Sequence, residues 1–194
     1  METERWVVID KPAGWLSIPG RNRAPVILEW VREIYPQIYT VHRLDIQTSG
    51  LILFARTADA HRLANGWFEK HEVKKAYDFL ASGKAPLPVS KTKEPIAGLA
   101  SATQFEMKEK FANAFLMRAF PMTGRRHQIR IHAAHLGFPI LGDIEYGGAA
   151  QVGASKIQRV ALHARSLELP SREKFEAPWP EDFSGWIKVF RTET

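Results

Sequence analysis

The sequence has 194 residues, and 45% of them are hydrophobic, which is enough for one domain with a substantial core. Lysine and arginine outnumber acidic residues by 27 to 21, and the resulting net charge of +6 favours a nucleic-acid partner. Because the sequence contains no cysteine, disulfides, thiolate metal sites and cysteine nucleophiles are excluded.

The amino-terminal region shows no targeting or membrane segment. The apolar run from Trp6 to Ile9 is too short for the core of a signal peptide, and nothing in the sequence approaches the length of a membrane span. We therefore expect a cytoplasmic protein without membrane attachment, folded as a single domain over residues 1–194.

The first half of the chain predicts strands and helices in alternation with loops. Trp6–Ile9 and the apolar run 51–55 are typical of buried strands, and Pro25 opens a helix that continues to about Tyr35. Thr57 is a predicted N-cap of a second helix, and a third strand covers residues 77–80. The predicted buried face of that helix is formed by Ala60, Leu63, Ala64, Trp67 and Phe68.

The second half predicts mostly strands. Residues 83–98 read as a surface loop, followed by strands over 101–109 and 112–120 that join near Asn113. A helix over 125–136 should end at Gly137, with Ile129, Ala133 and Leu136 facing the core. Further strands are expected over 160–169 and 175–177, before an irregular tail punctuated by Pro178, Pro180 and Gly185. Strands outnumber helices without strict alternation, which favours an α+β fold around a mostly antiparallel sheet.

A polar segment with a single carboxylate precedes the predicted strand 51–55. It runs His42-Arg43-Leu44-Asp45-Ile46-Gln47-Thr48-Ser49-Gly50. A carboxylate on a short segment anchored by a buried strand is held still, as a catalytic group must be. We interpret Asp45 as a nucleophile, against the simpler alternative of a hydrogen-bonded loop anchor.

A basic segment, Thr123 to Arg130, lies at the predicted start of the helix over 125–136. Helix N-termini offer unpaired N–H groups, and added arginines make a seat for phosphate or carboxylate. Arg130 follows Ile129 at the rim of the apolar face, so it should be partly buried and need an anionic partner. The spacing of His127, His132 and His135 differs from that of a zinc site, so we expect no metal.

Five blocks resemble the RluA-type pseudouridine synthase family in order and spacing, from about residue 7 to 183. The blocks are Asp10-Lys11-Pro12-Ala13-Gly14 with Ser17-Ile18-Pro19-Gly20; His42-Arg43-Leu44-Asp45 with Thr48-Ser49-Gly50; Lys75-Ala76-Tyr77; Thr123 to Arg130 with Gly137, Pro139 to Asp143 and Tyr146; and Leu162-His163-Ala164. The resemblance implies the pseudouridine synthase fold, with a bent, mostly antiparallel sheet flanked by helices and loops.

The resemblance also implies conversion of uridine to pseudouridine in structured RNA, a tRNA or rRNA stem-loop, without cofactor, metal or obligate protein partner, by a monomer. Asp45 would be the catalytic carboxylate, Arg130 its basic partner, and Tyr77 the aromatic side chain that stacks on the flipped-out base and accepts the C5 proton. A neighbouring arginine would keep the carboxylate charged. The residues expected to bind substrate are Arg43, His42, Lys75, Arg125, Arg126, His127, Gln128 and Leu162.

Other roles for some of these residues, and two other functions for the protein, also fit the sequence. His42 and His163 also fit as hydrogen-bonding framework residues, and Asp143 fits a turn in which its carboxylate binds backbone N–H groups. Arg126 stands where the family commonly has a small hydroxyl residue. We expect no S4-like RNA-binding module before the first block. A non-catalytic RNA-binding module and a glycoside-bond hydrolase that acts on nucleotides are the two rival functions.

Overall fold

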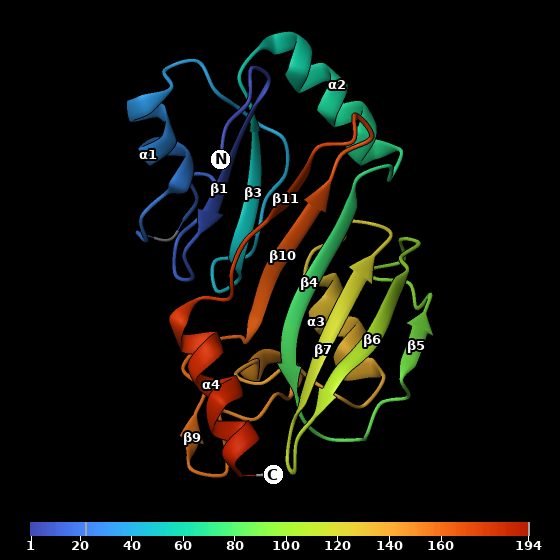
Figure 1. Ribbon diagram of the computed structural model, residues 1–194. Coiled ribbons are helices and arrows are strands. Elements are labelled where there is room, and N and C mark those ends of the chain that lie inside the picture. Colours follow the sequence, from blue (N-terminus) through green and yellow to red (C-terminus); the bar gives the residue numbers. More distant parts are fainter. Residues whose placement is uncertain (22, 194) are drawn as a thin grey trace. The chain divides into compact units, whose positions relative to one another are not determined.

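The computed structural model describes residues 1–21 and 23–193, which form two compact units (Figure 1). The first unit comprises Met1–Lys75 and Ala164–Ala177, and the second comprises Ala76–His163 and Pro178–Thr194. The chain passes between them within β4 (Lys74–Ala81), within β10 (Leu162–Glu168) and after Ala177. Each unit contains its own cluster of buried hydrophobic side chains.

In the first unit, β1 (Trp6–Lys11) and β2 (Tyr39–Thr40) pair with β3 (Ser49–Ala55), and β10 pairs with β11 (Lys174–Glu176), all antiparallel. In the pair of β1 with β3, Trp6 lies opposite Ala55 and Lys11 opposite Gly50. β2 pairs with the end of β3. All seven residues of β3 are buried, which confirms the strand predicted from the apolar run 51–55.

Two helices belong to the first unit. α1 (Ile27–Ile34) buries Ile27, Leu28 and Val31. α2 (Ala58–Glu69) begins as predicted, because Thr57 Oγ1 accepts a hydrogen bond of 3.1 Å from the backbone N of Ala60. The predicted inclusion of Leu63 in the buried face is wrong, since its side chain is exposed. The buried stripe is narrow and centred on Ala60 and Ala64, and Leu63 lies at its edge.

The sheet of the second unit has the order β4-β7-β6-β5, and all of its pairings are antiparallel. β6 (Thr103–Lys110) and β7 (Phe115–Pro121) are joined by the turn at Asn113 that the sequence predicts. The expected loop over 83–98 contains an edge strand, β5 (Val89–Thr92), so the loop prediction is wrong there. Its side chains are exposed or half-buried, and the segment lacks the apolar alternation that identifies most strands.

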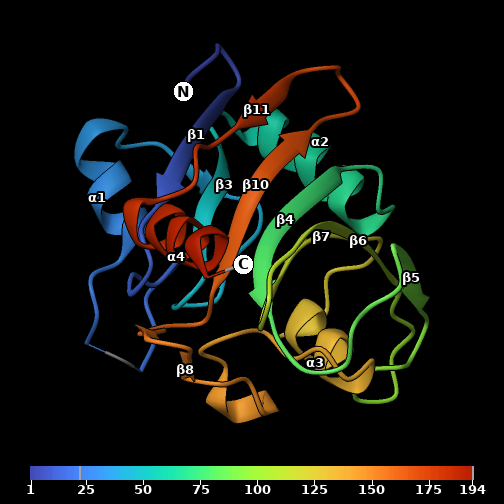
Figure 2. The ribbon, with the colours of Figure 1, turned by 60° about the horizontal axis from the view of Figure 1, so that its bottom comes forward.

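Helices α3 (Gln128–His135) and α4 (Glu181–Thr192) cover opposite faces of this sheet (Figure 2). On the α3 side, the ring of Phe105 lies 5.8 Å from that of Phe79 and 5.4 Å from that of Phe138. Asp78 points to the other face and accepts a hydrogen bond from Nε1 of Trp179, just before α4. Because side chains alternate along a strand, Tyr77 lies on the same face as Phe79, the face that α3 covers.

The predicted irregular tail after Pro178 is wrong, because residues 181–192 form α4. Pro180 is its N-cap, a position where the missing N–H costs nothing, and the first turn is acidic. The buried face consists of Phe183, Trp186, Ile187 and Phe190. Arg159 anchors the start of the helix through a bidentate pair with Asp182, at 2.6 and 2.9 Å.

Helix α3 starts three residues later than predicted. His127 has a φ of +54°, a left-handed conformation that no α-helix continues through, so the first helical residue is Gln128. Its other end is confirmed, because Gly137, with φ +88°, donates its N–H to the carbonyl of Ala134. Two short strands, β8 (Gln151–Val152) and β9 (Ser155–Lys156), and a 3-10 helix, Ile144–Tyr146, complete this unit.

Candidate functional site

Asp45 lies half-buried in the first unit, on a turn that leads into β3. The backbone on both sides of Asp45 is fixed by hydrogen bonds. Ser17 Oγ accepts from the N–H of Leu44 at 2.9 Å and donates to its carbonyl at 2.8 Å. On the other side, the carbonyl of Ile46 accepts from the N–H of Gly14 at 2.7 Å. The segment 14–17 thus holds the turn from two directions.

Lys11 completes this support from inside the unit. Its side chain is fully buried, and its ammonium group donates to the carbonyls of Pro12, Trp15 and Ile46 at 2.9, 2.9 and 3.4 Å. A buried ammonium group is tolerated when carbonyl oxygens replace its hydration. Sequence reasoning assigned no role to Lys11 or Ser17, although both lie in the first of the five family-like blocks. The position of Lys11 at the end of a strand predicted to be buried was the feature of the sequence that could have indicated its supporting role.

His42 is part of the framework of the same turn. Its Nε2 accepts a hydrogen bond of 2.9 Å from the N–H of Leu53, and its ring stacks on Phe68 at 4.9 Å. Burial, and in second place the charge of Lys75, lower the pKa of His42 to about 3, so the imidazole is neutral at physiological pH. Lys75 lies 5.9 Å from the Phe68 ring, and burial lowers the pKa of its ammonium group.

Gly50, at the end of the Asp45 segment, occupies a position that no other residue fits. Its φ is +107°, and a Cβ atom built there would lie 2.3 Å from the carbonyl oxygen of Ala164. Both the backbone conformation and the close approach therefore require glycine. Arg43, on the same segment as Asp45, is exposed.

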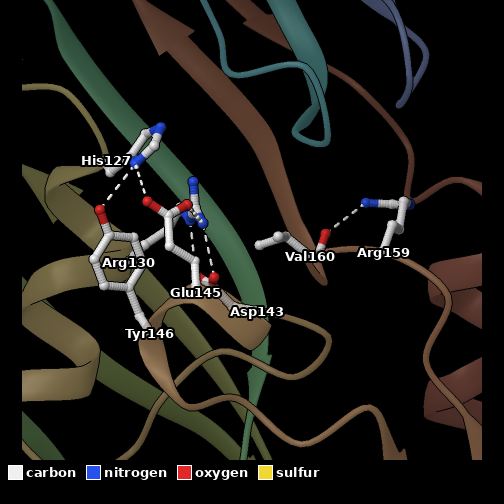
Figure 3. Close-up of polar contacts among 7 residues, drawn as sticks. All are labelled: His127, Arg130, Asp143, Glu145, Tyr146, Arg159 and Val160. Carbon is white, nitrogen blue, oxygen red and sulfur yellow. Dashed lines mark hydrogen bonds and ion pairs between the residues drawn. The ribbon is translucent and has the colours of Figure 1, made fainter.

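The second unit gathers charged side chains around Arg130 (Figure 3). Arg130, whose side chain is 9% exposed, forms a bidentate ion pair with Asp143, with Nε and Nη2 both at 2.7 Å from the carboxylate oxygens. Nη2 also donates to Glu145 Oε2 at 2.8 Å. The prediction that Asp143 uses its carboxylate to bind backbone N–H groups is wrong for the helix that it precedes, because the Asp143 side chain makes no cap hydrogen bond to residues 144–146 and pairs with Arg130 instead.

Aromatic groups enclose the same cluster. The guanidinium carbon of Arg130 lies 4.8 Å from the centroid of the Tyr146 ring. The hydroxyl of Tyr146 is 3.0 Å from Nδ1 of His127, and this nitrogen is 3.8 Å from Glu145 Oε1. Figure 3 shows His127, Glu145 and Tyr146 next to Arg130. Sequence reasoning named Asp143 and Tyr146 but missed Glu145, whose only signal was a second acid two residues after Asp143.

The other residues of the basic segment organise the turn before α3. The side chain of Gln128 is buried and bonds the N–H of Arg125 and the hydroxyls of Thr123 and Thr103. Arg125 Nε donates to the carbonyl of Ala100 at 3.1 Å, and Arg126 is exposed. The contacts of Gln128 are those of a structural residue, and its expected role in substrate binding stays a prediction.

Tyr77 and Leu162 differ in their environments. Tyr77 is half-buried on β4 and packs against the core of the second unit. Leu162 is only 4% exposed and belongs to that core. The structure thus groups Asp45 with His42, Arg43 and Lys75 in the first unit, and Arg130 with His127 in the second. The assigned roles of these residues, including the pairing of Asp45 with Arg130, stay predictions.

No group of three or more histidine and acidic side chains within residues 1–21 and 23–193 is arranged to hold a metal ion. Over the same residues, no helix is both long and apolar enough to cross a membrane.

Comparison with known proteins places this chain among enzymes of one kind. The family model described as RNA pseudouridylate synthase matches residues 5–135. Ribosomal large subunit pseudouridine synthase D of Pseudomonas aeruginosa is 32% identical, over 99% of this chain and 71% of its own length. The tRNA pseudouridine synthase C of Yersinia pestis is 33% identical, over 97% and 89%. The dual-specificity RNA pseudouridine synthase RluA of Escherichia coli is 35% identical, over 84% and 82%.

Two solved structures share the fold. Human RNA Pseudouridylate Synthase Domain Containing 4 has a TM-score of 0.86 at 20% identity and covers 98% of this chain and 92% of its own. Human RNA Pseudouridylate Synthase Domain Containing 1 has a TM-score of 0.76 at 22% identity, over 98% and 93%. These likenesses confirm the predicted α+β pseudouridine synthase fold. With the family model matching more than half of its residues, the chain belongs to the RNA pseudouridylate synthase family and is an isomerase of the RluA type.

Proposed function

We propose that this protein converts uridine to pseudouridine in a stem-loop of tRNA or rRNA, with Asp45 as the catalytic carboxylate and both units acting as one catalytic domain. The relatives named above support the RNA class, since one acts on ribosomal RNA, one on tRNA, and one has dual specificity. The net charge of +6 suits a phosphate-rich partner. We further propose a monomer that works in the cytoplasm without cofactor, metal or obligate protein partner.

The observation that carries the proposal is the support of the Asp45 turn. The buried side chains of Ser17 and Lys11, together with the backbone N–H of Gly14, fix the backbone on both sides of Asp45. A reacting carboxylate benefits from such prior ordering, because the cost of placing it is met when the protein folds. A loop anchor would need no such support on both of its flanks.

In the proposed reaction, the N1–C1′ bond of the target uridine breaks and C5 of the base joins C1′. The ionised carboxylate of Asp45 attacks the sugar or the ring, or stabilises the oxocarbenium-like centre that develops. Arg130 acts as its basic partner. The flipped-out base stacks on Tyr77, which lies half-buried on β4. Any bond that Asp45 has formed breaks before the product leaves, and the loss of the C5 proton together with the uptake of a proton at N1 completes the isomerisation. Tyr77 accepts that proton if a cationic neighbour assists its phenol.

The RNA itself is held by basic side chains in this proposal. Arg43 and Arg126 are exposed, and Lys75, Arg125 and His127 are half-buried, so each reaches the surface. Phosphate contacts of this kind offset the cost of unstacking the target base. His42, neutral and bonded to the N–H of Leu53, serves the framework of the site.

Tritium release from RNA labelled at uridine C5 tests the proposal, with tRNA and rRNA assayed as separate pools. Asp45→Asn and Asp45→Ala should each lower the rate by more than about a thousandfold, while RNA affinity stays within about twofold, because only the reacting group is lost. Asp59→Asn, at an exposed carboxylate in the first turn of α2, is the control and should keep the wild-type rate.

The products decide between the proposal and its rivals. Release of tritium with no free uracil supports isomerisation, whereas free uracil would indicate a hydrolase. Tight RNA binding without tritium release from either pool would overturn the proposal in favour of a non-catalytic RNA-binding module. Residual turnover in Asp45→Asn above a tenth of the wild-type rate would exclude Asp45 as the catalytic carboxylate.

A further inference from the structure

Arg130 binds two carboxylates, although one is enough to orient it. The bidentate pair with Asp143 uses Nε and Nη2, and two parallel hydrogen bonds fix the plane of a guanidinium. The ring of Tyr146, at 4.8 Å, limits its movement on one side. Glu145 adds one more hydrogen bond to Nη2, at 2.8 Å. Its effect is therefore mainly electrostatic, since the orientation of Arg130 is already determined.

The second carboxylate leaves the group of three side chains with an excess of negative charge. Arg130 carries one positive charge, and Asp143 alone balances it. The Asp143 side chain is 1% exposed, whereas that of Glu145 is 57% exposed, on the short 3-10 helix 144–146. The hydrogen bond from Arg130 lowers the pKa of the Glu145 carboxyl, which keeps it charged at neutral pH. Because the Glu145 carboxylate is 57% exposed, water can take the place of Arg130 as its partner, and the bidentate pair with Asp143 remains when Glu145 leaves.

The position that Glu145 occupies suits a phosphate group. An anion in its place would accept from Nη2 of Arg130 and would lie near Nδ1 of His127, which is now 3.8 Å from Glu145 Oε1. Arg126, the residue before His127, is exposed and adds positive charge. Of the two carboxylates of this cluster, that of Glu145 is the more exposed, at 57% against 1% for Asp143, so we call the Nη2 position that Glu145 occupies the outer edge of Arg130.

We propose that Glu145 is a displaceable internal anion, which occupies the outer edge of Arg130 in the RNA-free protein and yields this place to a phosphate of the bound RNA. The inference rests on the proposed function only in taking RNA as the ligand of the second unit. The negative charge of Glu145 would then weaken the binding of any RNA that leaves Glu145 in place. An RNA with a phosphate that reaches Arg130 would displace Glu145 and bind more tightly than the others, so Glu145 is a specificity-determining residue.

The test measures the dissociation constant of unfractionated tRNA for the wild-type protein and for two variants by filter binding, over a range of KCl concentrations. Glu145→Gln removes the charge and should tighten binding by roughly three- to fivefold, the equivalent of one exposed ion pair. The matched control is Glu109→Gln. Glu109 is also a partly exposed glutamate of the second unit that is bound to an arginine, Arg191, at 2.7 and 2.9 Å. It should change the affinity by less than about 1.5-fold.

Equal effects of the two variants would overturn the proposal, because they would show only the change in net charge. Weaker binding by Glu145→Gln would also overturn it. Glu145→Ala, which removes the hydrogen-bond acceptor as well, should tighten binding at least as much as Glu145→Gln. Tritium release is measured separately: a protein that binds tRNA without releasing tritium contradicts the proposed function, whereas the comparison of dissociation constants still decides the role of Glu145.

Discussion

In the first unit a buried cation, Lys11, faces neutral carbonyl oxygens, whereas in the second a buried cation, Arg130, faces carboxylates. Both arrangements satisfy a charge that water does not reach. They differ in what remains when one partner is removed. Loss of Lys11 removes one donor from three neutral carbonyl groups, while loss of Asp143 leaves a buried charge without its main counterion. The second unit should therefore be more sensitive to a single substitution.

The largest effect is expected for Asp143→Asn. The amide keeps the shape of the side chain but removes the charge that balances buried Arg130, so the free energy of unfolding should fall by about 3 kcal/mol. Urea denaturation followed by circular dichroism measures it. Asp182→Asn is a suitable comparison, because Asp182 forms the same bidentate pair with Arg159 but is 42% exposed, and should lose no more than about 1 kcal/mol. Similar losses in both variants would contradict this account of the Arg130 cluster.

A smaller loss is expected for Lys11→Met, which keeps the aliphatic volume and removes the ammonium group. Three carbonyls lose a charged donor, and the free energy of unfolding should fall by about 2 to 3 kcal/mol. At a temperature where the variant is fully folded, its rate of tritium release should still be lower than that of the wild-type protein, because the Asp45 turn has lost one of its supports. Lys74→Met, at an exposed lysine paired with Glu168, serves as control. Wild-type turnover in Lys11→Met would show that this support is dispensable.

The effect that is smallest near neutral pH is a dependence of stability on pH that comes from His42. Its pKa is about 3 in the folded protein and near 6.5 when unfolded, so between these values the unfolded chain binds one proton more. Stability should therefore fall as the pH is lowered through this window, by at most about 1.4 kcal/mol per pH unit. His42→Gln keeps an acceptor for the N–H of Leu53 and should show a correspondingly shallower slope from about pH 7 to about pH 4. Parallel slopes for both proteins would exclude His42 as the source.

Much of the fold followed from local patterns. Three features could be predicted because each depends on residues that are neighbours in the chain. They are the N-cap of α2 at Thr57, the buried strand β3 and the end of α3 at Gly137. The start of α3 was not, since the left-handed conformation of His127 is not encoded by a glycine or asparagine. Helix α4 was not predicted, because Pro178, Pro180 and Gly185 are residue types that favour irregular chain. In the structure Pro180 is the N-cap and Gly185 lies on the exposed surface of the helix.

In the candidate site, too, some residues could be predicted from the sequence and others could not. Sequence reasoning could name Asp45 and Arg130, because reactive and charged residues stand out by type. It could not predict that Arg130 binds Asp143 and Glu145, or that Lys11 binds the carbonyl of Ile46 beside Asp45, because tertiary packing determines these contacts. Supporting residues of a site carry no chemical signature of their own.

The burial of Lys11 makes this residue a chemical reporter. Amine-reactive reagents label lysines that water reaches, and the Lys11 ammonium group is enclosed by carbonyls of the Asp45 turn and its neighbours. Its labelling in the native protein would thus require the turn to open, so the rate of that labelling, followed by mass spectrometry of the peptide that contains it, reports how often the segment around Asp45 comes apart.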